Sequence, residues 1–98
     1  MEWLEIIELR SAPHAVCSVV AQLEALTEGA TEVTITIYRR QGLETDFSVH
    51  IGHESSTIDD QGSALGLLIA MALRKRGLVN HTVWVPNETG GTSPNVRG

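Results

Sequence analysis

The chain contains few cysteines, lysines and aromatic residues, and each shortage excludes a class of protein. Cys17 is the only cysteine, so the chain has no intrachain disulfide and no zinc site made of several cysteines, and we expect a reducing compartment. Lys75 is the only lysine, and the net charge is −5. Because a protein that binds the phosphate backbone is usually basic, we expect no nucleic-acid partner.

Long apolar runs and catalytic signature motifs are missing as well. The longest apolar run, residues 64–73, is about half of the roughly 20 residues that a membrane helix needs. The first residues, MEWLEIIELR, carry acids where a signal peptide has a basic start. The sequence has no phosphate-binding loop, dinucleotide fingerprint or Gly-x-Ser-x-Gly motif. We therefore expect a cytoplasmic protein without a membrane segment.

The apolar residues that are present follow the periods of strands and helices. Alternation, as in Val33, Ile35 and Ile37, predicts strands. Spacing of three and four residues predicts a first helix between Ser11, a candidate cap, and Gly29, a stop signal. The expected strands are residues 3–10, 32–39, 46–52 and 79–85, and the second helix is expected over about 60–76.

The order of these elements predicts the fold. Right-handed crossovers turn β-α-β-β-α-β into a four-stranded antiparallel sheet with both helices on one face, the ferredoxin-like α+β fold. We expect one domain over residues 1–86 and a disordered C-terminal tail over 87–98, which has little apolar content. This fold carries many functions, so the functional interpretation depends on particular side chains.

The segment SVHIGHESS combines two histidines and a carboxylate, as a metal site does. Side chains alternate along a strand, so His50 and His53 are expected on opposite faces of the sheet. Joint ligation would need a bulge or a bend at Gly52. We therefore predict no metal site, no cofactor, and histidines at the edge of the sheet and in the loop that follows.

Strand directions place two groups of polar and aromatic residues at the two ends of the sheet. One end is expected to gather Trp3, His53 and Trp84 near the start of the second helix. The other end is a candidate site for a small anion, because arginines meet a helix N-terminus there. The alternative is a solvated rim whose arginines pair with Asp46 or Glu44. The candidate ligand-binding residues are Arg10, Ser11, His14, Arg39 and His81, with Arg40 and Asn80 nearby.

The face of the sheet away from the helices is expected to be unusually apolar for a surface in water. Apolar residues occupy both phases of the first strand, and a tyrosine and a tryptophan lie on this face. Such a surface indicates a partner, a ligand or another subunit, and we predict a homo-oligomer, a dimer through this open face. The alternative contact is the second helix, through Leu67 and Met71. The expected open-face residues are Thr34, Thr36, Tyr38, Ser48, His50, Thr82 and Trp84.

The segments EIIELR, VTITIYRR, TDFSVHI and GLVNHTVWV resemble in layout the dimeric α+β-barrel proteins of the antibiotic-biosynthesis-monooxygenase-like group. The resemblance covers most of residues 3–86. It implies two ferredoxin-like sheets stacked open face to open face, and the group includes cofactor-independent oxygenases, haem degraders and small proteins without known activity. No catalytic motif matches position by position, so the resemblance assigns no catalytic residue.

Two functions follow from these observations. The favoured one is a small self-associating protein that binds a partner or a small ligand. The alternative is a cofactor-independent enzyme with His50 as general base, since imidazole titrates near neutral pH, and with Tyr38 and Trp84 lining the pocket. An enclosed cavity of a few hundred Å³ that contains His50 would favour the enzyme.

Overall fold

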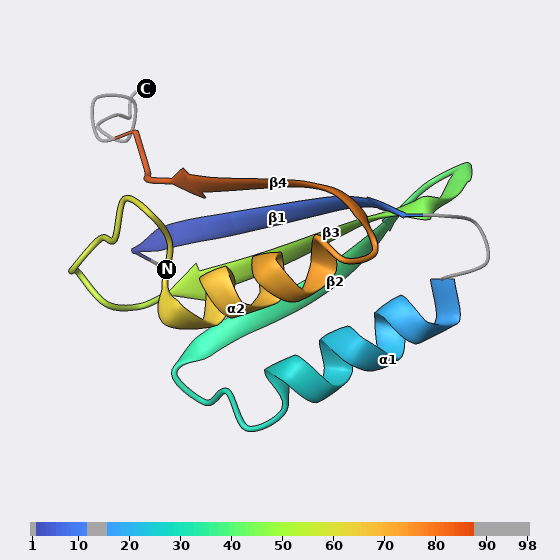
Figure 1. The fold of residues 1–98 in the computed structure, drawn as a ribbon. Helices are drawn as coiled ribbons and strands as arrows, with labels where there is room; N and C mark the ends of the chain where they lie inside the picture. The colour runs from blue at the N-terminus through green and yellow to red at the C-terminus, as the bar shows by residue number, and fades with distance from the viewer. Residues whose placement is uncertain (1, 12–15, 88–98) are drawn as a thin grey trace.

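The computed structural model describes residues 2–11 and 16–87 (Figure 1). The elements follow the expected order, β-α-β-β-α-β. They are β1 (Trp3–Ser11), α1 (Val16–Thr27), β2 (Val33–Arg40), β3 (Leu43–His53), α2 (Ala64–Leu73) and β4 (Gly77–Trp84). His14 and nearly all of the C-terminal tail lie outside the described residues.

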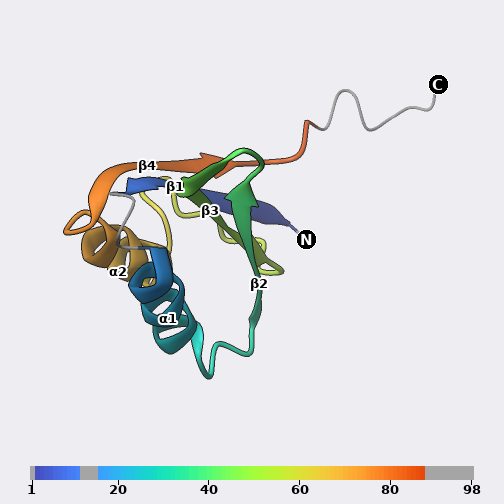
Figure 2. The same ribbon diagram turned by 90° about the vertical axis from the view of Figure 1, so that its right-hand side faces the viewer.

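The four strands form one antiparallel sheet in the order β2-β3-β1-β4. Figure 2 shows α1 and α2 side by side on the same face of this sheet, and no helix of the described residues lies on the opposite face. This arrangement is the ferredoxin-like fold, as the sequence predicts. No described helix is long and apolar enough to span a membrane.

One helix prediction needs correction, and another falls partly outside the described residues. Ser11, the expected cap of the first helix, is the last residue of β1, and its hydroxyl donates to the carbonyl of Thr45 at 2.8 Å. The residues that follow it, 12–15, lie outside the described part of the chain. The second helix is shorter than expected, because its N-cap is Ser63, whose Oγ accepts from the Gly66 amide at 3.0 Å. The loop between β3 and α2 is correspondingly longer, and it brings Ser63 to the end of the sheet.

The hydrophobic core lies between the sheet and the two helices. Its members have at most 4% of their surface exposed. Full burial of such a side chain stabilises the fold by about 1.5–3 kcal/mol. The core residues are Ile7, Leu9, Val19, Leu23, Phe47, Val49, Ile51, Ile69, Ala70 and Leu73.

The pairing register decides which side of β1 faces the helices. Ile7 and Leu9 lie in the core, so the same phase of the strand turns Trp3 and Glu5 toward the helices, and both are buried. The opposite phase, which includes Leu4 and Ile6, faces away from the helices. The open face therefore carries the predicted residues together with those of β1. Tyr38 is 51% exposed and Trp84 56% exposed there.

Candidate functional site

A fully buried carboxylate, Glu5, lies on β1, on the helix-facing side of the sheet and against the start of α2. None of its surface is exposed. A buried carboxylate is costly unless hydrogen bonds replace its hydration, so its surroundings have to supply donors. The sequence pattern does not predict a buried position for this residue, because apolar side chains occupy both sides of its strand.

Four hydrogen bonds converge on the Glu5 carboxylate. Ser63 donates twice, from its amide to Oε1 at 3.0 Å and from its hydroxyl to Oε2 at 2.5 Å. His53 Nε2 lies 2.6 Å from Oε2, and His81 Nε2 lies 2.8 Å from Oε1. The two histidine side chains are each 8% exposed. We call Glu5, His53, Ser63 and His81 the Glu5 cluster.

The antiparallel register explains why these residues meet. The residues directly opposite Glu5 are Ile51 on β3 and Val83 on β4. His53 lies two positions after Ile51, opposite Trp3, and His81 lies two positions before Val83, opposite Ile7. They are diagonal neighbours of Glu5 on the same face of the sheet, within reach of a long side chain. Three strands therefore place one carboxylate between two imidazoles.

The cluster holds Glu5 in its ionised form. Burial by itself raises the pKa of the Glu5 carboxyl, but hydrogen bonds from Ser63, His81 and His53 lower it and prevail, so that this pKa lies below its usual value of 4.5. An ionised carboxylate only accepts hydrogen bonds, so each imidazole donates its Nε2–H to Glu5. When such a ring is neutral, its Nδ1 atom is a hydrogen-bond acceptor.

Two glycines make room for this carboxylate. A Cβ atom at Gly66, in the first turn of α2, would collide with the Glu5 carboxylate. A Cβ atom at Gly62 would lie 2.5 Å from the His81 ring, and Gly62 has a φ of +99°, which other residues rarely adopt. The start of α2 therefore lies directly against the sheet, with Ser63 capping the helix and binding Glu5 at once.

Trp3 covers one side of the cluster. Its ring stacks on His53, with ring centroids 3.9 Å apart and an angle of 11° between the planes. Its indole Nε1 is buried without a hydrogen-bond partner. The expected group at this end of the sheet is therefore correct for Trp3 and His53. Trp84 lies at the same end but on the open face, where its indole donates to Thr82 at 2.8 Å.

His50 and His53 point to opposite faces of the sheet, as predicted. His50 pairs with Thr36 in the register and lies on the open face. Its ring meets the Tyr38 ring edge to face, with centroids 4.7 Å apart. Among residues 2–11 and 16–87, no three His, Cys, Asp or Glu side chains are arranged so that they could hold a metal ion.

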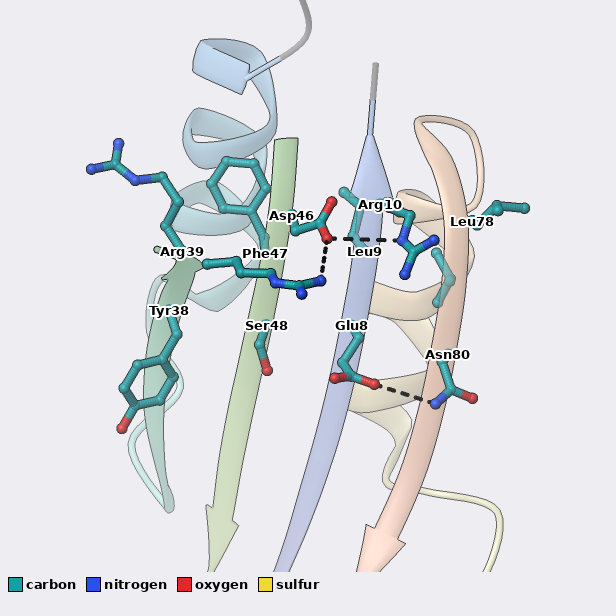
Figure 3. A pocket seen from close by; sticks show the side chains of 12 residues that line it. Glu8, Leu9, Arg10, Tyr38, Arg39, Asp46, Phe47, Ser48, Leu78 and Asn80 are labelled. Carbon is teal, nitrogen blue, oxygen red and sulfur yellow. Dashed lines mark hydrogen bonds and ion pairs between the residues drawn. The ribbon is translucent and has the colours of Figure 1, made fainter. Parts of the chain in front are cut away.

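A hollow of about 520 Å³ lies at the end of the sheet opposite Trp3 (Figure 3). We call it the rim hollow. Asp46 lies in it and pairs with two arginines, with Arg10 Nε at 3.8 Å and Arg40 Nη1 at 3.4 Å. Arg39 also lines the hollow, but its guanidinium points away from Asp46. The expected pairing of rim arginines with Asp46 is therefore present.

The candidate ligand-binding residues do not all meet at this rim. Arg10 and Arg39 line the rim hollow. Ser11 lies in β1 next to Thr45, and His14 lies outside the described residues. The expected place of His81 is wrong, because β4 pairs with β1 so that His81 lies opposite Ile7 and reaches Glu5. A ligand-binding role for the rim stays a prediction.

Once the phase of β1 is known, the alternation of apolar residues along three strands indicates that the residues of the Glu5 cluster on those strands are buried. Glu5 shares its strand phase with Ile7 and Leu9, while His53 follows Ile51 and His81 follows Val79 in the inward phases of their strands. Three titratable residues in inward phases require partners. The missing information was the phase of β1, which apolar residues on both sides of the strand left ambiguous.

The fold of the described residues is similar to that of several proteins of known structure. The structure is a ferredoxin-like domain of the kind seen in antibiotic-biosynthesis-monooxygenase-like dimeric α+β-barrel proteins, as the sequence resemblance implied. No protein-family model and no curated protein matches the sequence.

Three solved structures illustrate this likeness. Rv0793 from Mycobacterium tuberculosis has a TM-score of 0.64 and 17% identity, over 89% of this chain and 96% of that one. A structure described as an antibiotic biosynthesis monooxygenase has a TM-score of 0.62 and 12% identity, over 87% and 96%. SnoaB, a cofactor-independent oxygenase from Streptomyces nogalater, has a TM-score of 0.55 and 15% identity, over 89% and 95%. At these identities the likeness concerns the fold.

Proposed function

We propose that this chain is a self-associating binding module whose open sheet face receives a second copy of itself. The observation that carries the proposal is the large side chains left uncovered on that face. Leu78 is 75% exposed, and Tyr38 and Trp84 are each more than half exposed. An isolated antiparallel sheet with one face in water normally presents polar side chains there.

The energy of covering these side chains is of the size that a dimer requires. Full burial of one large apolar side chain contributes about 1.5–3 kcal/mol, so completing the burial of a half-exposed one contributes roughly 1–2 kcal/mol. A twofold contact buries the same residues on both subunits. Six such side chains contribute about 6–12 kcal/mol, comparable with the roughly 4–15 kcal/mol that association costs.

The rim hollow is the proposed place for a small ligand in this module. Its volume, about 520 Å³, lies in the range of ligand pockets. Its cationic side chains, Arg10, Arg39 and Arg40, outnumber its carboxylates, Glu8 and Asp46. This balance favours a small carboxylate or phosphate.

A cofactor-independent enzyme is the second candidate function. The observation in its favour is the contact between His50 and Tyr38, a general base candidate beside a phenol on the open face. His50 lines neither the rim hollow nor the second hollow, which lies at the opposite end of the sheet. The binding module is therefore the better supported function.

Sedimentation velocity tests the self-association. We expect the wild type to sediment as a dimer at tens of micromolar, and we expect Trp84→Glu and Thr36→Arg on the open face to produce monomers. The control is Leu67→Glu, at a 43% exposed position on α2, which should remain dimeric. A monomeric wild type, or a monomer produced only by the Leu67 variant, contradicts the proposal.

A further inference from the structure

A second hollow, of about 600 Å³, lies at the end of the sheet where β2 begins and β3 ends. We call it the strand-end hollow. His53 lines it, although this residue is only 7% exposed. The hollow therefore borders the Glu5 cluster through His53. Its other lining residues are Thr31, Glu32, Val33, Thr34, Glu54 and Ser55.

In the His53 ring, Nε2 is hydrogen-bonded to Glu5, and Nδ1 is the nitrogen that could bind a ligand. Its Nε2 donates to Glu5, and the stacked Trp3 ring fixes its plane. Its Nδ1 makes no hydrogen bond to the described residues. Trp3 Nε1 is the one fully buried side-chain nitrogen or oxygen without a partner in that part of the chain, so His53 Nδ1 is not completely buried. With the proton on Nε2, this atom is a hydrogen-bond acceptor.

The lining of the strand-end hollow selects the charge of a ligand. It contains two acidic residues, Glu32 and Glu54, of which Glu54 already has an interaction partner, and it contains no lysine or arginine. Glu5 adds a buried negative charge behind His53, and the whole chain has a net charge of −5. Coulomb repulsion excludes a carboxylate or phosphate ligand, in contrast to the arginine-lined rim hollow. An acceptor nitrogen among carboxylates fits a ligand that donates hydrogen bonds and is positively charged.

We propose that the strand-end hollow binds the ammonium group of a small amine, that His53 Nδ1 accepts a hydrogen bond from it, and that Glu5 is the positioning residue that holds the ring proton of the neutral imidazole on Nε2. Carboxylates that orient an imidazole through its other nitrogen act in this way in many sites. The site does not depend on self-association through the open face, so the two proposals can fail separately.

Three probes of similar size and different charge test the charge preference. Protein labelled with ¹⁵N is titrated with ethanolamine, ethylene glycol and glycolate, and the ring signals of His53 and the amides of residues 31–34 are followed by NMR. We expect saturable shifts with ethanolamine and no shift with glycolate. For the neutral glycol we expect an affinity lower by about tenfold, because its hydroxyl donates a hydrogen bond without the positive charge. Absence of shifts with ethanolamine, or equal shifts with glycolate, overturns the proposal.

The role of Glu5 is tested in the ring of His53 itself. Glutamine at this position presents an amide N–H to an imidazole, so in Glu5→Gln we expect His53 to move its proton to Nδ1 and to bind ethanolamine about tenfold more weakly. The matched control is Glu8→Gln, on the same strand but on the exposed face, which should change neither the tautomer nor the affinity. An unchanged His53 tautomer in Glu5→Gln contradicts the assignment.

Discussion

Replacing Glu5 by glutamine should destabilise the domain far more than its conservative chemistry suggests. The side chain keeps its size but loses its charge and one acceptor oxygen. In the wild type, Oε2 accepts from His53 and from the Ser63 hydroxyl, and Oε1 accepts from His81 and the Ser63 amide. An amide group in place of Oε2 would present hydrogens to two donors.

The expected loss is about 2–4 kcal/mol. A hydrogen bond to a charged group contributes roughly 1.5–3 kcal/mol, and a buried donor without a partner costs about 1–3 kcal/mol. Ring tautomerism at His53 and rotation of the Ser63 hydroxyl recover part of this loss, so the full sum over four bonds is not expected. For a domain of this length the loss corresponds to a fall in Tm of about 10–25 °C.

Urea unfolding at pH 7 measures this loss. The Glu5→Gln variant should have a lower midpoint with an unchanged slope, because the surface exposed on unfolding is the same. The control is Glu8→Gln, whose carboxylate is exposed and bonded to Asn80 at 3.3 Å, and it should lie within about 0.5 kcal/mol of the wild type. If the two variants are equally stable, the Glu5 cluster does not hold the fold together as argued.

The difference in the free energy of unfolding between the wild type and Glu5→Gln should depend on pH in the acid range. The pKa of folded Glu5 lies below its usual value of 4.5. Its contribution to the free energy of unfolding is therefore complete above that value and is lost as the pH falls through the folded pKa, where the unfolded chain binds the extra proton. The gap between wild type and Glu5→Gln should be constant near neutral pH and should close below about pH 4.5. A gap that widens on acidification contradicts the assigned ionised state.

Two further predictions concern the room around the carboxylate and the rim. Gly66→Ala should destabilise the domain by about 1–3 kcal/mol in thermal unfolding. The reason is that overpacking of the added methyl group against Glu5 outweighs the roughly 1 kcal/mol that alanine gains over glycine in a helix. A variant more stable than the wild type would show that α2 and Glu5 are further apart. Titration with phosphate should shift NMR signals of Arg10 and Arg39 at millimolar concentration. Asp46→Asn should strengthen the binding of phosphate, because it releases Arg10 and Arg40 from their ion pairs. Unmoved signals in both proteins would refute an anion site at the rim.

The fold was predictable because each element has a clear period or boundary signal. Alternation in β2 and β3 fixes which side chains face the helices, and Tyr38 and His50 lie on the open face as predicted. The position of Trp84 on the open face follows in the same way from the alternation of side chains along β4. Strand phase alone is enough for these residues, because their neighbours are apolar on one side only.

The Glu5 cluster was less accessible because it depends on phase and register together. Apolar residues occupy both phases of β1, so the inward position of Glu5 was hidden. His81 was expected near Arg10, and only the offset of β4 relative to β1 shows that it reaches Glu5 instead. Ser63 joins the cluster because α2 starts four residues later than expected, and that start is set by a side-chain cap.

The Glu5 cluster also has a consequence for the folding kinetics of the chain. Its hydrogen bonds join residues 48, 58 and 76 positions apart, so it closes some of the longest loops in the domain. Long loops cost the most entropy to close, and such contacts tend to form late, after the hairpin of β2 and β3. Contacts absent from the transition state govern the rate of unfolding rather than that of folding. The Glu5 cluster therefore slows unfolding. Its loss should shorten the lifetime of the native state, while refolding proceeds at nearly the wild-type rate.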